Sequence, residues 1–193
     1  MRVNLNGIVK TEPEKIRTFN DGSIVYQCYI ENKRLSGKSD LIRVTYAFDK
    51  LSIGDCVDII GDVRSMKLNG KDNIYVHAKS LTLISCIDYY KNIVIDSGTL
   101  AHPISYREKS DSSNVMIADM ILQENRGWGR NNYIYCSVWG DNVNKCKEFH
   151  VQDTIEIVGR LQSRQKDNYV STEVSILKLR KGDSNNAEGS SEA

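Results

Sequence analysis

The sequence predicts an all-β protein made of two similar halves, and three observations support this prediction. The segments 51–65 and 149–163 repeat each other at a fixed offset of 98 positions, which marks a duplicated unit. Each half contains five short runs that alternate or are rich in β-branched residues, and polar turns separate these runs. Helical periodicity is rare in both halves. Two copies of about 85 residues exclude a solenoid, which needs at least three shorter repeats.

The repeat favours two small domains within the 193 residues. The matched residues are Asp55 with Asp153, Val57 with Ile155, Ile59 with Ile157, Ile60 with Val158, Gly61 with Gly159, and Ser65 with Ser163. We expect four segments, namely a first domain at 1–84, an apolar connection at 85–91, a second domain at 92–181 and a disordered acidic tail at 182–193. The connection carries Ile87, Tyr89 and Tyr90, so we expect the two domains to lie in contact.

The runs predict strands in order along the chain. In the first half these strands lie at 4–9, 23–31, 41–48, 56–65 and 73–83, and in the second at 92–100, 115–123, 133–139, 154–162 and 168–179. Five strands per half suit two tandem five-stranded barrels of the OB type. After the third strand of the second half, Val143, Cys146 and Phe149 recur every three residues, which predicts the short helix of an OB barrel. The first half has only DKLSIG there, which predicts a turn.

Composition favours a cytoplasmic protein without a metal centre. No apolar run reaches the length of a membrane span, and the N-terminus lacks the charged and apolar blocks of a signal peptide. The five cysteines form no CxxC pair, which indicates a reducing compartment and buried thiols. Cys146 and His150 alone do not make up a zinc site. We therefore predict no metal, no cofactor and no membrane partner.

Basic residues are concentrated in four segments that we predict to be hairpin tips. The net charge of the chain is only +1, but each of these segments is positive. Their cations are Lys33, Arg34 and Lys38 in 31–40; Arg64, Lys67 and Lys71 in 64–72; Arg126 and Arg130 in 124–132; and Arg160, Arg164 and Lys166 in 160–167. A single basic tip is unremarkable because tips are polar, but four in register across a duplication indicate a polyanionic partner.

A row of aromatic residues accompanies the basic segments of the second half. In the run YIYCSVWG, alternation turns the aliphatic residues into the barrel and leaves Tyr133, Tyr135 and Trp139 outside. Trp128 lies between two glycines in the neighbouring basic loop. Exposed rings beside basic loops suit single-stranded nucleic acid, because bases stack on the rings while cations contact the phosphates. The alternative is that these rings cover a neighbouring barrel or a dimer partner.

The first half lacks this aromatic row. Its third run, LIRVTYAF, turns Arg43 outward together with Leu41, Thr45 and Ala47. A surface with charge but without rings favours phosphate contacts, so we expect the first half either to bind nucleic acid more weakly or to serve mainly in assembly.

Four stretches resemble bacterial single-stranded DNA-binding proteins, namely RLSGKSD, IGDCVDIIGDVRS, IADMILQENRGWGRNNYIYCSVWG and IEIVGRLQSRQ. The resemblance covers residues 1–180, and the two-barrel type of clostridia-like Firmicutes and their mobile elements is the most similar. It implies an OB fold, no catalysis, no cofactor and a functional unit of four barrels, hence a homodimer. It also implies base stacking on Tyr133 and Trp139, association with the nucleoid, and a role in DNA replication, recombination or repair. The chain ends without the Pro-Phe tip through which such proteins recruit replication enzymes, so that recruitment is not implied.

Two other functional classes compete with this interpretation. The three histidines are scattered, and the sequence shows no Gly-rich phosphate loop, nucleophile elbow or pair of carboxylates, so we predict that the protein is not an enzyme. OB barrels also bind proteins, and an adaptor that binds protein partners rather than nucleic acid suits the ring-poor first half. The sequence leaves open whether DNA or RNA is preferred, because stacking surfaces accept both.

Overall fold

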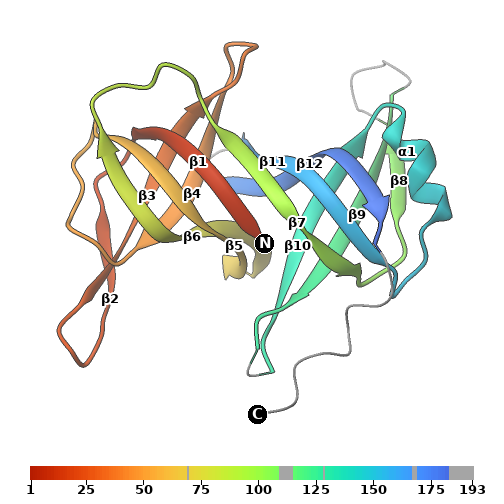
Figure 1. Cartoon of the computed structure of the whole chain (residues 1–193), viewed down its shortest axis with the longest axis horizontal. Coiled ribbons are helices and arrows are strands. Elements are labelled where there is room, and N and C mark those ends of the chain that lie inside the picture. The colour runs from red at the N-terminus through yellow and green to blue at the C-terminus, as the bar shows by residue number, and fades with distance from the viewer. Residues whose placement is uncertain (69, 109–114, 128, 167–168, 183–193) are drawn as a thin grey trace.

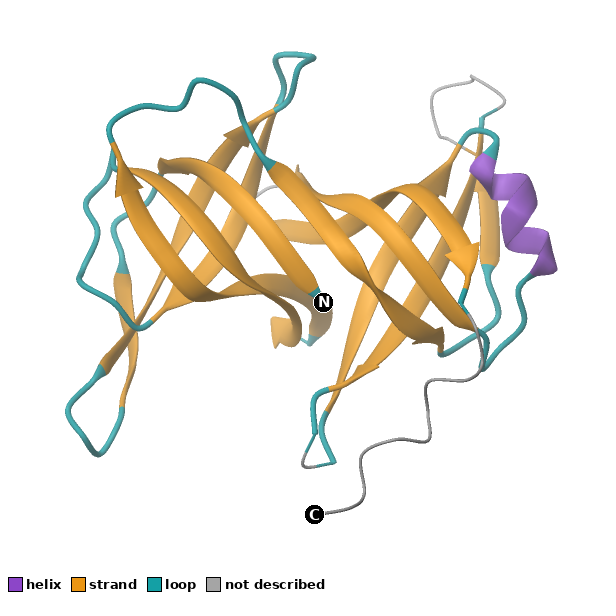
Figure 2. Ribbon diagram, in the orientation of Figure 1, coloured by secondary structure: helices purple, strands orange, loops and turns teal. Residues whose placement is uncertain are grey.

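The computed structural model describes residues 1–68, 70–108, 115–127, 129–166 and 169–182. The predicted site residue Trp128 and the predicted disordered tail from residue 183 onward lie outside this part, as do the side chains of Lys71 and Lys166. In the described part, twelve strands pair into one continuous sheet, and one short helical segment lies at its side (Figure 1, Figure 2). The predicted all-β class is therefore confirmed.

Six strands come from the first half, namely β1 (Arg2–Val9), β2 (Glu14–Thr18), β3 (Ile24–Lys33), β4 (Ser39–Tyr46), β5 (Cys56–Leu68) and β6 (Lys71–Ile84). Pairings join five of them in a closed ring that runs β1–β3–β4–β6–β5 and back to β1. The β4–β6 pair is parallel, and the other four pairs are antiparallel. Strand β2 pairs with β3 outside the ring.

The second half repeats this arrangement with β7 (Asn92–Leu100), β8 (Ser105–Glu108), β9 (Met116–Asn125), β10 (Asn131–Trp139), β11 (Thr154–Lys166) and β12 (Tyr169–Lys181). Its closed ring runs β7–β9–β10–β12–β11 and back to β7, and β8 pairs with β9 outside it. The predicted short helix is present after β10 as α1 (Asn142–Lys145) and η1 (Cys146–Glu148), because Val143 and Cys146 are buried against the core.

Strands β2 and β8 were not predicted from the sequence. Every residue of both strands is exposed, so neither shows the alternation of buried and exposed residues that marks a strand in a sequence. The ten predicted runs all overlap strands of the structure, and the two additional strands extend each half beyond the expected five.

The duplicated glycines, Gly61 and Gly159, mark the same bend in both halves. A β-bulge interrupts the pairing at Ile60/Gly61 and again at Val158/Gly159. A Cβ atom on Gly61 would lie 2.4 Å from the carbonyl oxygen of His77, and one on Gly159 would lie 2.8 Å from that of Ser175. Because no side chain fits where the two backbones approach so closely, both positions require glycine.

The halves meet where β1 pairs antiparallel with β7, with Val3 opposite Val94 and both side chains fully buried. We call this β1–β7 pair the seam. It joins the two rings into one sheet, and Figure 1 shows β1 and β7 crossing the middle of the molecule side by side. The two halves are therefore in direct contact, as the apolar connection suggested.

The segments 64–72 and 160–167 lie at the ends of the β5–β6 and β11–β12 hairpins, but the strands run further into them than we predicted. β5 continues to Leu68 and β11 continues to Lys166, so Arg64, Arg160 and Arg164 lie on strands. These long arms extend because each one packs on the other half. Asn73 of β6 donates its side-chain amide to the carbonyl oxygen of Val170 (2.7 Å) and accepts the N–H of Thr172 (2.8 Å).

Candidate nucleic-acid interface

The outer face of β10 carries the aromatic row that alternation predicted. Ile134, Cys136 and Val138 are buried in the core. Of the outward rings, Tyr133 is 42 % exposed, whereas Tyr135 and Trp139 are half-buried. The indole N–H of Trp139 donates to Ser137 Oγ (3.2 Å), which fixes this ring against the sheet. Tyr133 therefore offers the most accessible stacking surface of the row.

Carboxylates lie among the cations of this face. Arg164 Nη2 donates to Glu173 Oε1 (2.9 Å), and the Ser137 hydroxyl donates to the same oxygen (3.0 Å). On the neighbouring strand, Arg107 Nη2 donates to Asp119 Oδ1 (3.2 Å). These ion pairs partly neutralise the positive charge beside Trp139. Arg164 therefore lies beside the predicted aromatic face, but its charge is already paired with that of Glu173.

The first half contains a ring that the sequence analysis missed. Tyr29 of β3 lies under the guanidinium of Arg43, whose carbon is 5.1 Å from the ring centroid. Arg43 also donates to the Tyr29 hydroxyl (2.6 Å) and to Gln27 Oε1 (3.2 Å). The signal was available in the sequence, because Cys28 and Ile30 are buried core residues and alternation therefore turns Tyr29 outward. The first half thus presents charge and a ring together.

The duplicated serines link each half to a strand of the other. The N–H of Tyr133 donates to Ser65 Oγ (3.1 Å), and the N–H of Leu41 donates to Ser163 Oγ (2.8 Å). The long arm of the first half therefore lies beside β10, and the long arm of the second half lies beside β4. The structure thus places each arm against the opposite half.

Several predicted cations meet across the seam. Arg126, from the β9–β10 turn of the second half, is close enough to His77 of the first half to act on its ionisation. Burial lowers the pKa of His77, and the charges of Arg64 and Arg126 lower it further. Symmetrically, Arg160 of the second half lies close to Arg34 of the first. The structure thus brings predicted residues of the two halves together in pairs.

Other predicted residues are already engaged in contacts within the protein. Arg34 Nε donates to the buried carboxylate of Asp40 (2.6 Å), and this hydrogen bond raises the pKa of Arg34. Asp40 also accepts the N–H of Ser163 (2.8 Å), so Arg34 is committed to holding the halves together. Among the described side chains, the exposed predicted cations are Lys33, Lys38, Lys67, Arg126, Arg130 and Arg164.

The described part of the chain offers no group of three His, Cys, Asp or Glu side chains that could hold a metal ion. Burial raises the pKa of the Cys146 thiol to about 11 and that of Cys28 to about 12, which keeps both thiols protonated and unreactive at neutral pH. Within the described ranges, no helix is long and apolar enough to cross a membrane.

Comparison with solved structures identifies the architecture. The sequence matches no family model and no curated protein. The wild-type single-stranded DNA-binding protein from Thermus aquaticus superimposes with a TM-score of 0.74 at 19 % identity, over 100 % of this chain and 95 % of that one. A deletion mutant of the same protein gives a TM-score of 0.75 at 18 % identity, over 94 % of this chain and 93 % of the other. The chain therefore has the fold of the Thermus aquaticus single-stranded DNA-binding protein along its whole length.

Proposed function

We propose that this protein binds single-stranded DNA with little sequence preference, without catalysis, and protects exposed strands during replication, recombination or repair. One observation carries the proposal. The exposed ring of Tyr133 lies where the first half's β5, which bears Lys67 on the same face as Ser65, bonds to the backbone of β10. Stacking on the ring and a phosphate contact to this cation together supply what sequence-tolerant single-strand binding requires.

Both halves contribute to this proposed surface. Tyr29 and Arg43 give the first half a stacking platform of its own, in addition to the phosphate contacts expected from the sequence. The crossed arms bring cations of each half to the other half's face. We therefore propose one composite surface for a single strand, with the second half as its principal stacking site because Tyr133, Tyr135 and Trp139 lie in one row.

We also propose that each closed ring is an OB-type barrel, with domains at 1–84 and 92–181 joined by the connection at 85–91. The closed pairings and the short helix after β10 support this division. The solved structures of the same fold are named as single-stranded DNA-binding proteins, which agrees with the proposed ligand.

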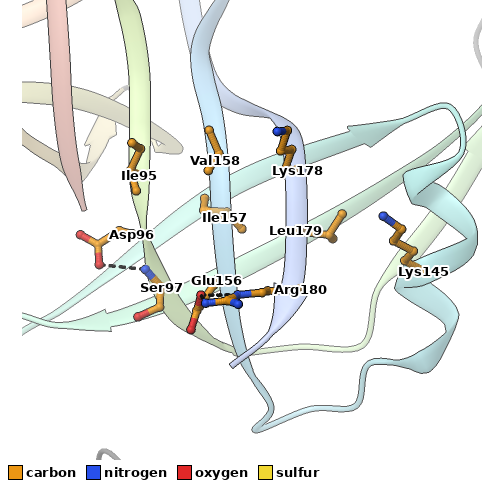
Figure 3. A pocket seen from close by; sticks show the side chains of 10 residues that line it. All are labelled: Ile95, Asp96, Ser97, Lys145, Glu156, Ile157, Val158, Lys178, Leu179 and Arg180. Carbon is orange, nitrogen blue, oxygen red and sulfur yellow. Dashed lines mark hydrogen bonds and ion pairs between the residues drawn. The ribbon is translucent and has the colours of Figure 1, made fainter. Parts of the chain in front are cut away.

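The outer face of the seam supports a homodimer with four such barrels. Ile60 on β5 is 47 % exposed, and Ile93 and Ile95 on β7, on the other side of β1, are 47 % and 57 % exposed. Ile60 and Ile93 lie on either side of the exposed Asn4, and Ile95 lies between Arg2 and Val158. Figure 3 shows Ile95 and Val158 side by side at the edge of a hollow of about 780 Å³. Several exposed aliphatic residues on one face of a sheet favour association, and we assign this face to a second copy.

The test of the function is a titration of the tryptophan fluorescence with poly-dT, poly-U and duplex DNA. We expect poly-dT to bind well above duplex, because stacking needs unpaired bases, and to bind with a log–log salt slope of about −3 to −5 if half a dozen cations engage. Duplex that competes equally, or an affinity independent of salt, contradicts the proposal.

An adaptor function is the second candidate, and one observation favours it. A hollow of about 720 Å³ lies at the end of the first ring, beside the turn that replaces a helix, and exposes Phe48 and Leu83. In the second half, α1 and η1 occupy the corresponding place. An adaptor leaves a heparin column at low salt and carries no polynucleotide on purification, whereas a nucleic-acid binder does the opposite.

A further inference from the structure

A pocket of about 440 Å³ opens where three segments meet beside the seam. The segments are the β3–β4 hairpin of the first half, the connection between the halves, and β11 of the second half. Its walls carry one acid, Asp88, and a larger number of basic and aromatic side chains, namely Lys33, Arg34, Tyr89, Tyr90, Lys91 and Arg160. We call it the connection pocket. Its volume falls in the range of sites that hold a small organic ligand.

The walls of the connection pocket are fixed by hydrogen bonds. Asn6 donates its side-chain amide to the carbonyl oxygen of Tyr89 (2.9 Å) and accepts the N–H of Lys91 (2.7 Å). Asn32 donates to the carbonyl oxygen of Lys91 (2.8 Å). The connection is therefore held against β1 and β3 before any ligand binds, and a preformed site loses little entropy on binding.

Among the side chains of the connection pocket, Arg160 points most clearly to a bound ligand. Its Nε atom is buried and has no hydrogen-bond partner in the described part of the chain. Burial lowers the pKa of Arg160, and the neighbouring charge of Arg34 lowers it further. Arg34 is paired with Asp40, and Lys91 is paired with Asp58 (2.7 Å). The charge of Asp40 offsets only part of the lowering of the pKa of Arg160. An anion in the pocket would supply negative charge beside this guanidinium.

Tyr89 supplies a ring beside this cation. It is 68 % exposed, and Lys91 Nζ lies 5.7 Å from its ring centroid. A large aromatic side chain this exposed gains little from packing. Its face is open to a planar group, and the adjacent ammonium favours a ligand that carries negative charge as well.

We propose that the connection pocket binds one nucleotide of a single strand where the strand passes from the first half to the second, with its phosphate on Arg160 and its base on Tyr89. This inference rests on the proposed function and deepens it. A free nucleotide offers the same phosphate and base, so the experiment has to separate the two sources. The observations favour the strand, because the pocket lies between the two halves that carry the stacking faces.

The test compares Tyr89→Ala and Arg160→Gln with wild type on two oligonucleotides. A strand of about 8 nucleotides occupies one half, and one of about 40 crosses between halves, since an OB fold covers roughly 4–16 nucleotides. We expect Tyr89→Ala to weaken the long strand about 5- to 150-fold, the effect of one stacked base, and to leave the short strand unchanged. Arg160→Gln is expected to weaken the long strand about tenfold and to reduce its salt slope by about 0.7.

Matched controls are Tyr106→Ala, which removes an exposed tyrosine from β8, and Lys147→Gln, which removes an exposed charge from η1. Neither is expected to change binding of either oligonucleotide. Irradiation of wild type with a long strand containing 5-iodouracil supplies a direct readout, and we expect a crosslinked peptide that contains Tyr89. Circular dichroism and thermal unfolding establish that each variant is folded.

The outcomes separate this inference from the proposed function. Wild type that binds neither oligonucleotide overturns the function itself. If wild type binds both oligonucleotides, and Tyr89→Ala and Arg160→Gln bind them equally well, only the assignment of the connection pocket is overturned. Micromolar binding of 5′-dTMP to wild type but not to Arg160→Gln, undisturbed by the long strand, assigns the pocket to a free nucleotide and overturns its assignment to the strand.

Discussion

Truncation of Tyr133 is the most direct probe of the stacking surface. Tyr133 and Tyr106 are 42 % and 41 % exposed, but the first lies on the outer face of β10 and the second on β8. Tyr133→Ala keeps the backbone N–H that donates to Ser65, so the contact between the halves survives the change. We therefore expect a loss of about 1–3 kcal/mol in single-strand affinity, which is roughly 5- to 150-fold, with little loss of stability.

The assay is a fluorescence anisotropy titration of labelled oligo-dT, accompanied by thermal unfolding of each variant. Tyr106→Ala is the matched control and should bind as wild type does. Trp139→Ala should lose a similar affinity but also some stability, because its half-buried indole donates to Ser137. Wild-type affinity in Tyr133→Ala, or an equal loss in Tyr106→Ala, would refute the assignment of this face.

Three further outcomes are expected. Arg43→Ala should lose less affinity than Tyr133→Ala and reduce the salt slope by about 0.7, because it removes one phosphate contact; an unchanged slope at varied salt would exclude Arg43 from the site. Ile95→Lys should convert a dimer to a monomer in light scattering, and a wild-type monomer at micromolar concentration would remove the proposed dimer. Because the folded-state pKa of His77 is lowered, its contribution to stability is present above the unfolded pKa of about 6.5 and is lost as pH falls. Urea midpoints should therefore fall more between pH 7 and 5 in wild type than in His77→Gln, and equal falls would contradict this.

The sequence was informative wherever a residue's environment repeats along the chain. Alternation in β10 identified Tyr133, Tyr135 and Trp139 as outward, and the fixed offset of 98 identified Gly61 and Gly159 as equivalent. These features are local, because each depends on period-two geometry or on a match between two segments. The all-β class and the short helix after β10 follow from the same kind of signal.

Contacts between the halves could not be obtained in this way. Ser65 and Ser163 match in the repeat, but the match does not reveal that each serine bonds to the opposite half. Nothing local distinguishes Arg34, held by buried Asp40, from the exposed Lys33 beside it. Such differences arise from tertiary packing across the seam, so they required the three-dimensional structure.

The order of strands in the continuous sheet also determines which strands form its two edges. Its two terminal strands are β2 and β8, with five and four residues. Both are short and carry charged side chains, and a bulge between Lys15 and Arg17 distorts the pairing of β2 with β3. Short, charged and irregular edges resist pairing with the edges of other molecules. A protein whose strands are almost all paired internally can thus reach high local concentration on a polymer without growing edge to edge into aggregates.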